Sequence, residues 1–482
     1  MSKRIVAILL CLGLVLAVAV TGVAAPKKVT ITVQMFSGPE YDAMAPTAKY
    51  WNEKYSASTG ITVNAVALSR MGYQEKMQAQ LVAGLREPDL VHPFNMQLGK
   101  LRPYLEDLRP YFGRSEIMTG PDGEKYSIDG LLEVALATVT TADGAVLGMP
   151  KDMSELLIYY RKDIISKPPE TWPELVEVAK KFTKSINASS PTEYGVVLQG
   201  KYEKWTYCSG LEALWPAGYE IFKPGDKEIA PYNPDAVKAF QVYVDLYKAG
   251  ALYPGFDNTE YPEVSAAMES GNCAMAVQWN ANYFSLSNKE MSPKVYDKIA
   301  LAAPPGWKGA DGKVKRAMYV QTINLALNKK SRNKDAAMKF LAWSSLGEGA
   351  ILYAKYGGSS PIKKVWLAKD AMMPYPVIAP MVQQWGRPLP MHNDMSELVM
   401  IGSSWFQKVG IGAATAEQAA KGLPEEMAAF PQDEVSSACK ESGGRVRPAP
   451  LLEEPTWKPR LELSRSKKAA CSANSWRTPS ST

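Results

Sequence analysis

The stretch GMPKDMSELLIYYRKDIISKPPETWPELVEVAKKF, residues 148–182, contains the pattern that decides the fold. It predicts a strand that ends at Pro150, a second strand LLIYYRKD, and then a pair of prolines that leads into a helix. Thr171 precedes that helix and Glu174 follows three residues later, a capping box in which both side chains satisfy free backbone amides. Strands that lead into helices in this way are typical of α/β proteins.

The residues before this stretch continue the alternation of strands and helices. KVTITVQMF (28–36) and ITVNAVAL (61–68) alternate with a period of two, whereas YQEKMQAQLVAG (73–84) has apolar residues four apart. A further helix is expected over 43–55, and PDLV (88–91) contains a short buried strand. This β-α-β-α-β order predicts a largely parallel sheet covered by helices.

The residues after 182 also show the patterns of strands and amphipathic helices. NPDAVKAFQVYVDLYKAG (233–250) and SRNKDAAMKFLAW (331–343) both predict amphipathic helices. AMAVQWNANYFS (274–285) begins as a buried strand and then places aromatic and amide side chains together. We therefore expect an α/β fold throughout the body of the chain.

The two ends of the chain differ from the body. Residues 1–25 combine a short positive start, an apolar run and the small residues Val23-Ala24-Ala25, which predicts a cleaved secretory signal. A retained membrane anchor is the competing interpretation. Residues 424–482 are rich in Pro, Ser, Arg and Glu without a sustained period, so we expect a disordered tail or the product of a shifted reading frame.

Composition limits the chemistry that the chain can perform. The net charge of +6 on 482 residues is too small to indicate nucleic-acid binding. The chain has only two histidines and no Cys-x-x-Cys motif, which leaves few ways to build a metal centre or a Ser-His-Asp triad. We expect no metal, no cofactor and no catalytic residues. Cys208 and Cys273 are the only cysteines of the body, and the sequence leaves open whether they pair.

Several blocks together resemble a known family. The end Tyr-Arg-Lys-Asp of the strand at 156–163 and the following Pro-x-Thr-Trp-x-Glu are similar to the extracellular solute-binding proteins of family 1, the maltose-binding-protein-like receptors of ABC importers. Further blocks agree in the same order, namely QLVAGLREPDLV, AVKAFQVYVDLYKAGAL, CAMAVQWN, NLALNKKSRNKDAAMKFLAWSS and YGGSSPIKK.

The resemblance implies a periplasmic-binding-protein-like fold of type II, in which two α/β lobes are joined by a three-segment hinge. Transferred to this sequence, lobe 1 comprises residues 26–151 plus 318–357, and lobe 2 comprises residues 152–317 plus 358–423. The chain would cross between the lobes near 151–154, 318–319 and 357–360. A ligand would lie in the cleft between the lobes, and hinge closure over it is the behaviour of such receptors.

A neutral sugar requires hydrogen-bonding side chains for its hydroxyls and flat aromatic rings for its apolar C–H faces. The segments that the family places at the cleft provide such residues. The candidates for ligand binding are Ser37, Asn95, Gln97, Asp152, Glu155, Tyr202, Trp205, Trp215, Trp279, Asn280, Tyr283, Tyr319, Gln321 and Ser359. Each has a structural alternative: the tryptophans could form an ordinary core, and Asp152 and Glu155 could belong to the hinge alone.

The resemblance thus implies a monomeric receptor that is exported to the periplasm or to the outer face of the cytoplasmic membrane. It would deliver a sugar or small oligosaccharide to the permease of an ABC importer. A receptor for another polar solute, such as a polyamine or a polyol phosphate, is the main alternative. An exported glycoside hydrolase is the alternative from another class, since it too places carboxylates near aromatic rings.

Overall fold

The computed structural model describes residues 26–225 and 227–431. The strands are β1 (Val29–Phe36), β2 (Ile61–Leu68), β3 (Leu90–Val91), β4 (Met149–Arg161), β5 (Tyr194–Val197), β6 (Cys273–Trp279), β7 (Ile299–Ala302), β8 (Trp307–Lys308), β9 (Val314–Lys315), β10 (Met318–Leu327) and β11 (Gly386–Pro388).

The helices are α2 (Pro39–Lys54), α3 (Ser56–Thr59), α4 (Tyr73–Val82), α5 (Leu98–Leu101), α6 (Arg109–Phe112), α7 (Ser115–Met118), α8 (Glu133–Ala137), α9 (Trp172–Lys181), α10 (Lys204–Leu214), α11 (Val237–Ala249), α12 (Tyr261–Glu269), α13 (Asn282–Leu286), α14 (Lys334–Leu346), α15 (Glu348–Lys355), α16 (Lys363–Trp366), α17 (Tyr375–Trp385), α18 (Met395–Gly410) and α19 (Ala416–Ala429).

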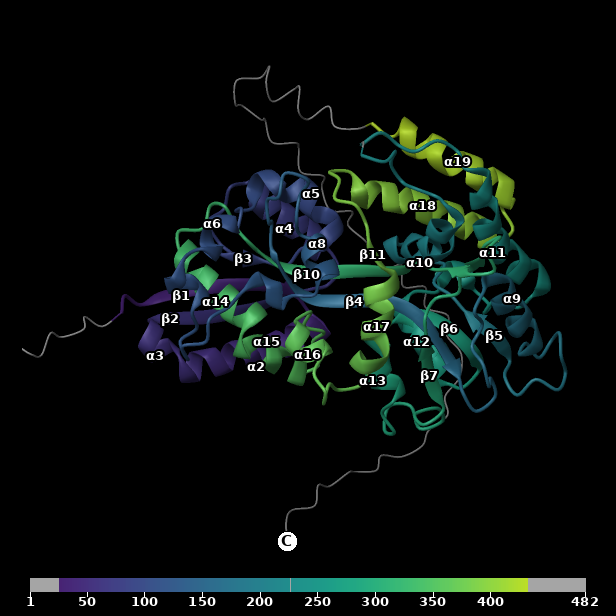
Figure 1. The fold of residues 1–482 in the computed structure, drawn as a ribbon, viewed down its shortest axis with the longest axis horizontal. Coiled ribbons are helices and arrows are strands. Elements are labelled where there is room, and N and C mark those ends of the chain that lie inside the picture. The colour runs from purple at the N-terminus through teal and green to yellow at the C-terminus, as the bar shows by residue number, and fades with distance from the viewer. Residues whose placement is uncertain (1–25, 226, 432–482) are drawn as a thin grey trace, which may run out of the picture. The chain divides into compact units, whose positions relative to one another are not determined.

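The main sheet has the strand order β2-β1-β3-β10-β4-β6-β5, with β11 paired to β10 and β7 paired to β4. β1 pairs with β2 and β3 in parallel, whereas β10 is antiparallel to both β3 and β4. β1, β2 and β3 lie at one end of the sheet and β5, β6 and β7 at the other, while β4 and β10 run between them (Figure 1). The described chain therefore has two α/β lobes that share the long central strands.

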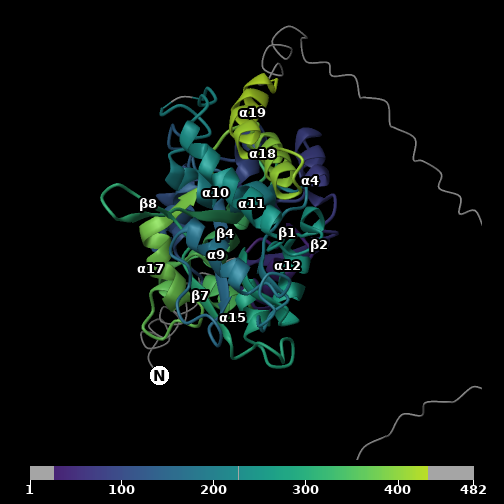
Figure 2. The ribbon, with the colours of Figure 1, turned by 90° about the vertical axis from the view of Figure 1, so that its right-hand side faces the viewer.

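Helices cover both faces of the central strands. α10 and α18 lie on one face, and α12, α13 and α17 lie on the other (Figures 1 and 2). The side chains of β4 divide between the two faces, because successive residues of a strand point in opposite directions. Leu156 and Ile158 belong to one buried cluster, and Met153, Leu157 and Tyr159 belong to the other.

Most of the predicted elements are confirmed. β1 and β2 lie where the period of two predicts them, and they pair in parallel over eight residues each. Thr171 and Glu174 form the predicted capping box at the start of α9. The prediction of two separate strands, one ending at Pro150 and one over 156–163, is wrong, because a single continuous strand, β4, runs through both. The residues between them, 152–155, pair with β10 and so remain extended.

The C-terminal boundary of the body also differs from the prediction. The predicted tail begins at 424, but α19 continues to Ala429 and buries Met427 in the core. The remainder of that tail, like the predicted signal at 1–25, lies outside the described residues. Cys208 and Cys273 are both buried free thiols, so they do not pair. Among the described residues, no helix is long and apolar enough to cross a membrane.

Candidate functional site

The three segments predicted to cross between the lobes lie side by side. Residues 152–155 of β4 pair with β10. On the other side of this strand, the backbone N–H of Met153 donates to the carbonyl of Ser359 over 2.9 Å. The N–H of Ser359 in turn donates to Asp152 Oδ2 over 2.8 Å. The first predicted crossing is therefore hydrogen-bonded to residues 320–323 of β10, which directly follow the second predicted crossing, and to Ser359 of the third.

A continuous row of aromatic rings lies next to this unit. The row, called the aromatic row below, consists of Phe36, Phe94, Trp205, Trp279, Tyr319 and Trp215. Successive ring centroids are 5.6, 5.4, 5.3, 5.9 and 6.2 Å apart in that order. Four predicted ligand residues thus contact each other in one row, together with two rings that the prediction did not include.

The aromatic row joins the two ends of the sheet. Phe36 ends β1 and Phe94 follows β3, whereas Trp205 lies on α10 and Trp279 ends β6. Trp279 is only 5% exposed and Tyr319 is fully buried, so their neighbours cover them almost completely. Trp205 is half-buried and contacts Phe94 edge to face. The contact between Phe94 and Trp205 therefore joins the end of the sheet that holds β1 and β3 to α10.

The Asp152 carboxylate accepts hydrogen bonds from residues that are distant in the sequence. Its Oδ2 accepts hydrogen bonds from the Ser359 N–H and, over 3.1 Å, from the Tyr353 hydroxyl. The pKa of Asp152 is raised to about 7, chiefly by burial and also by the negative charge of Glu40, although these hydrogen bonds oppose the shift. Lys151 beside it is fully buried, with its Nζ 4.0 Å from the centre of the Tyr353 ring. Burial lowers the pKa of Lys151 to about 7.

Glu155 lies on the opposite face of β4 from the aromatic row. Its pairing partner on β10 is Val320, which belongs to the second buried cluster, whereas Leu156 pairs with Trp279. Glu155 is fully buried, and its burial raises its pKa well above the ordinary value. Asn280 lies on this side as well, where its Nδ2 donates to Ser359 Oγ over 3.4 Å. The structure thus separates the predicted polar residues Glu155 and Asn280 from the predicted rings.

Several predicted ligand residues contain buried oxygens without a hydrogen-bond partner in the described chain. They are both carboxylate oxygens of Glu155, Oδ1 of Asn95, Oδ1 of Asn280 and Oε1 of Gln321. Buried polar atoms in proteins are almost always paired with protein, water or ligand. This concentration of unpaired atoms around the crossings is what a site for a polar solute requires.

An open groove adjoins the aromatic row. It has a volume of about 500 Å³ and is lined by Gln74, Glu75, Gln78, Gln97, Lys100, Leu101, Tyr202, Lys204, Ser396, Glu397, Met400, Ile401 and Phe430. We call it the α4–α18 groove. It contains the predicted residues Gln97 and Tyr202, and Tyr202 is 52% exposed. The Nζ of Lys204 lies 5.7 Å from the Phe94 ring, which places the groove next to the row.

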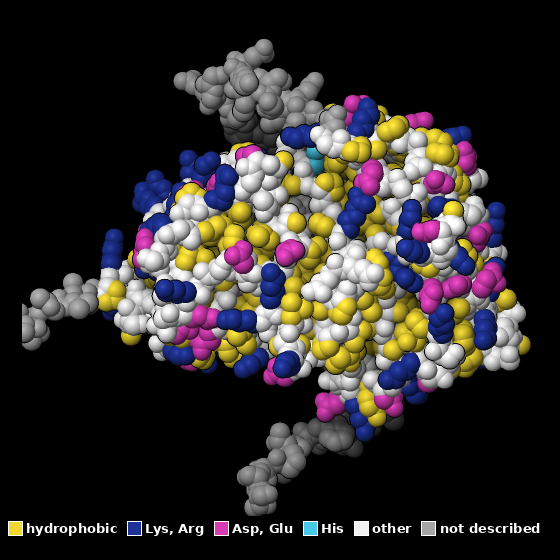
Figure 3. Space-filling view, in the orientation of Figure 1, with side chains coloured by type: hydrophobic (Ala, Val, Ile, Leu, Met, Phe, Trp, Pro, Cys, Tyr) yellow, Lys and Arg dark blue, Asp and Glu magenta, His cyan; other side chains and the backbone are white. Residues whose placement is uncertain are grey.

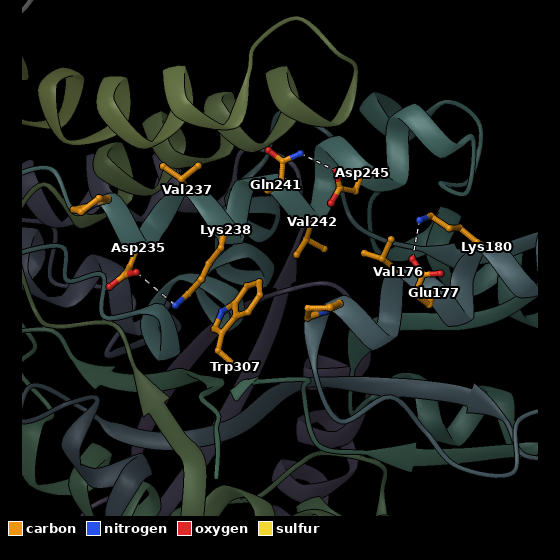
Figure 4. A pocket seen from close by; sticks show the side chains of 12 residues that line it. Val176, Glu177, Lys180, Asp235, Val237, Lys238, Gln241, Val242, Asp245 and Trp307 are labelled. Atoms are coloured by element: carbon orange, nitrogen blue, oxygen red, sulfur yellow. Dashed lines mark hydrogen bonds and ion pairs between the residues drawn. The ribbon is translucent and has the colours of Figure 1, made fainter. Parts of the chain in front are cut away.

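A second hollow, of about 550 Å³, lies between α9 and α11 beside Trp307 (Figure 4). It contains none of the predicted ligand residues. Its charged side chains partner their own neighbours, with Glu177 2.8 Å from Lys180 and Asp235 3.9 Å from Lys238. We therefore do not assign it to the site.

Eight predicted residues belong neither to the aromatic row nor to the α4–α18 groove, and two of these eight are not buried. Ser37 is exposed in the loop after β1, and Tyr283 is half-buried with its ring edge against Phe284. The prediction did not include Glu40, or Arg70, whose guanidinium lies 4.7 Å from the Phe36 ring and 3.5 Å from Glu40. Both directly follow the ends of parallel strands, a position that could have pointed to them.

On the face shown in Figure 3, acidic side chains lie among the basic ones, so this face is neither mainly positive nor mainly negative. Within the described residues, no group of three or more His, Cys, Asp or Glu side chains could hold a metal ion.

Comparison with curated proteins finds relatives that bind solutes. The chain is 31% identical over 253 residues to a probable ABC transporter-binding protein of Deinococcus radiodurans, which is 50% of this chain and 57% of that protein. It is 29% identical over 167 residues to the sn-glycerol-3-phosphate-binding periplasmic protein UgpB of Brucella abortus, 32% of this chain and 36% of that protein. The chain thus spans between about a third and somewhat over half of the length of these relatives.

Solved structures resemble the whole fold. Maltose-bound MalE3 of T. maritima has a TM-score of 0.68 and 24% identity, covering 83% of this chain and 98% of that one. A solute-binding protein of Agrobacterium radiobacter K84 in complex with ribitol also has a TM-score of 0.68, with 22% identity, covering 84% of this chain and 99% of that one. Both likenesses show the two-lobed, type II fold. The model of the family described as bacterial extracellular solute-binding protein matches residues 38–346, and the chain therefore belongs to this family.

Proposed function

We propose that the chain is the substrate-binding receptor of an ABC importer and captures a sugar or small oligosaccharide between its lobes. Lobe 1 comprises residues 26–151 plus 318–357. Lobe 2 comprises 152–317 plus 358–423, extended by the last turns of α19 to Ala429. The receptor acts as a monomer, is exported, and delivers its ligand to the permease subunits in the membrane.

One observation carries this proposal: the aromatic row lies beside the segments predicted to cross between the lobes, together with the unpaired buried oxygens of Asn95 and Gln321. Rings offer flat apolar faces to the C–H groups of a sugar. Unpaired oxygens, such as Oδ1 of Asn95 and Oε1 of Gln321, accept hydrogen bonds from its hydroxyls. MalE3 was solved with maltose, and the Agrobacterium protein with ribitol, so the fold accommodates polyhydroxy solutes.

A polyol phosphate is the second candidate, because the relatives from Brucella are named for sn-glycerol 3-phosphate. Arg70, Lys204 and Arg387 all lie beside rings of the aromatic row, and Glu40 and Glu220 partly neutralise the two arginines. Asp152 and Glu155 add further buried carboxylates. Burial raises the pKa of both groups and so favours their neutral forms, which give little attraction to a polyamine. The amide oxygens and the rings fit hydroxyls and C–H faces.

A thermal-shift screen separates these candidates, because a ligand that binds only the folded state raises its melting temperature. The panel contains mono- and oligosaccharides, alditols, sn-glycerol 3-phosphate, spermidine and putrescine. We expect saccharides to raise the melting temperature by several degrees and the phosphate to have no effect. Stabilisation by sn-glycerol 3-phosphate or by the amines alone would replace the sugar with that solute.

A further inference from the structure

Exposed cations gather at the end of the sheet that lies away from the aromatic row. β1 runs towards Phe36 of the row, so its first residues lie at the opposite end, at the left of Figure 1. β10 is antiparallel to β3, so the residues after Leu327 return to that same end. The cations of this surface, called the basic patch below, are Lys27, Lys28, Arg86, Lys329, Lys330 and Arg332, and all of them are exposed.

Buried polar side chains tie together the loops that carry these cations. The side-chain amide of Asn328 donates to the carbonyl of Leu85 over 2.9 Å. Asp89 joins two further segments, because its Oδ1 accepts from Ser331 Oγ over 2.5 Å and its Oδ2 accepts from the backbone N–H of Thr32 over 2.9 Å. The fold therefore fixes three segments that are distant in the sequence next to one another at this surface.

The positive charge of the basic patch is largely unopposed. Within the described residues, no ion pair involves one of its cations. Glu106 pairs with Lys334 over 2.8 Å and Asp335 pairs with Arg114 over 2.7 Å, so these two acidic residues are already engaged. Glu87 is an exposed carboxylate within the patch and leaves it strongly positive.

Exposed apolar side chains lie beside the cations. Val82 is 54% exposed and Leu85 is 47% exposed, and Leu85 directly precedes Arg86. Surfaces that bind a membrane combine basic side chains, which attract anionic headgroups, with apolar side chains that enter the interface. The basic patch has both components.

The position of the basic patch along the chain also favours a membrane as its partner. The apolar run of the predicted signal or anchor covers residues 5–20, and Lys27 follows it closely. Residues 20–27 span at most about 25 Å when fully extended. The patch therefore lies beside the part of the chain that the sequence predicts to enter a membrane.

We propose that the basic patch binds the anionic lipid headgroups of a membrane surface, with Leu85 entering the interface. None of the predicted ligand residues belongs to the patch, so the aromatic row stays free when the patch rests on lipid. This inference goes beyond the proposed function, because a receptor can capture its solute without touching lipid.

Flotation with lipid vesicles tests the inference on the chain as it is recovered after export from a bacterial host. The vesicles contain phosphatidylcholine alone, or phosphatidylcholine with about 30% phosphatidylglycerol as the anionic lipid. We expect the anionic vesicles to bind the chain at least about tenfold more tightly, and we expect high salt to remove this gain.

Variants of the basic patch locate the binding surface. The triple variant Lys329→Gln, Lys330→Gln, Arg332→Gln should lower the affinity for anionic vesicles by at least about tenfold, because each cation near an anionic surface contributes about fivefold. Leu85→Ser should lower it by about threefold or more, because its apolar side chain no longer enters the interface.

The matched control removes the same charge from another part of the surface. Lys308, Lys313 and Lys315 are exposed cations of the β8–β9 hairpin, and their joint replacement by Gln should leave the affinity for anionic vesicles nearly unchanged. All these chains have the same N-terminus, so residues 1–25 cannot cause a difference between them.

Two results would overturn the inference. Equal affinity for the two kinds of vesicle would show that the chain does not bind anionic lipid. An equal loss of affinity in the patch variant and the hairpin variant would show that net charge alone attracts the chain. The patch variant should keep the thermal shift caused by saccharides, so a failure of this inference and a failure of the proposed function are distinguishable.

Discussion

Trp205 and Trp279 lie in the same aromatic row but differ in how far they are buried. Trp279 is 5% exposed between the rings of Trp205 and Tyr319, so its truncation would leave a cavity in the fold. Trp205 is half-buried at the contact between the lobes. In the proposed function, a ligand that enters there would replace the contact of Trp205 with Phe94. At the scale of single residues, Trp205 is therefore the ring whose loss reports on binding rather than on folding.

We predict that Trp205→Ala weakens sugar binding by about 1–3 kcal/mol through lost aromatic contact. Trp405→Ala, which truncates another half-buried tryptophan remote from the row, is the matched control. Calorimetry measures the affinities, and urea unfolding shows whether either variant is destabilised. Equal affinity of wild type and Trp205→Ala would remove Trp205 from the site.

Asp152 should make stability depend on pH. Its pKa is raised in the folded chain to about 7, because burial disfavours the charged form. A raised folded pKa stabilises the fold at low pH, and this contribution is lost as the pH rises from about 4 through 7. In Asp152→Asn the amide stays neutral at every pH, and its oxygen can still accept from Ser359 and Tyr353.

The variant Asp152→Asn should therefore be more stable than wild type at pH 8, by an amount on the order of 2–4 kcal/mol, and nearly equal to it below pH 5. Urea unfolding at a series of pH values measures the difference. Because the charge of Asp152 also affects the pKa of Lys151, the same comparison is made in a Lys151→Met background. A difference that does not grow between pH 5 and pH 8 would show that Asp152 is ionised without penalty.

At the scale of elements, the sequence correctly predicted the strands and helices whose local patterns were strong. The period of two located β1 and β2, and the capping box located the start of α9. The prediction failed in β4, because the polar residues Asp152, Ser154 and Glu155 are typical of a loop. Pairing with β10 keeps them extended, and that partner is distant in the sequence. α19 extends past 424 for a similar reason, since Met427 contacts Tyr219 Oη at 3.7 Å.

The cap of α9 allows a test of an element without touching the site. Thr171 Oγ1 accepts the backbone N–H of Glu174 over 3.3 Å. Thr171→Ala should lower the free energy of unfolding by about 1 kcal/mol and leave sugar affinity unchanged. Urea unfolding and calorimetry measure the two quantities. Reduced affinity in this variant would mean that α9 is coupled to the cleft.

At the scale of the whole molecule, family-like blocks were enough to predict the fold, whereas the three crossings and the ligand residues stay predictions. The order of these blocks indicated a receptor, whereas the contacts among Phe36, Phe94 and Trp205 depend on how the ends of the sheet meet. Glu40 was not predicted, and Arg70 was left out of the site as a solvated charge, because a single charge near the end of a strand resembles any solvated side chain. Their proximity to Phe36 arises only in the folded chain.

The central claim is that the two lobes hold a hydroxyl-rich solute and break no bond in it. Equilibrium dialysis of the full chain against a labelled sugar from the thermal-shift panel, followed by mass spectrometry of the recovered ligand, tests this most directly. The account predicts one molecule retained per chain and recovered intact. Sugar recovered in cleaved form, or retention that the Trp205→Ala variant leaves unchanged for every sugar tried, would contradict it.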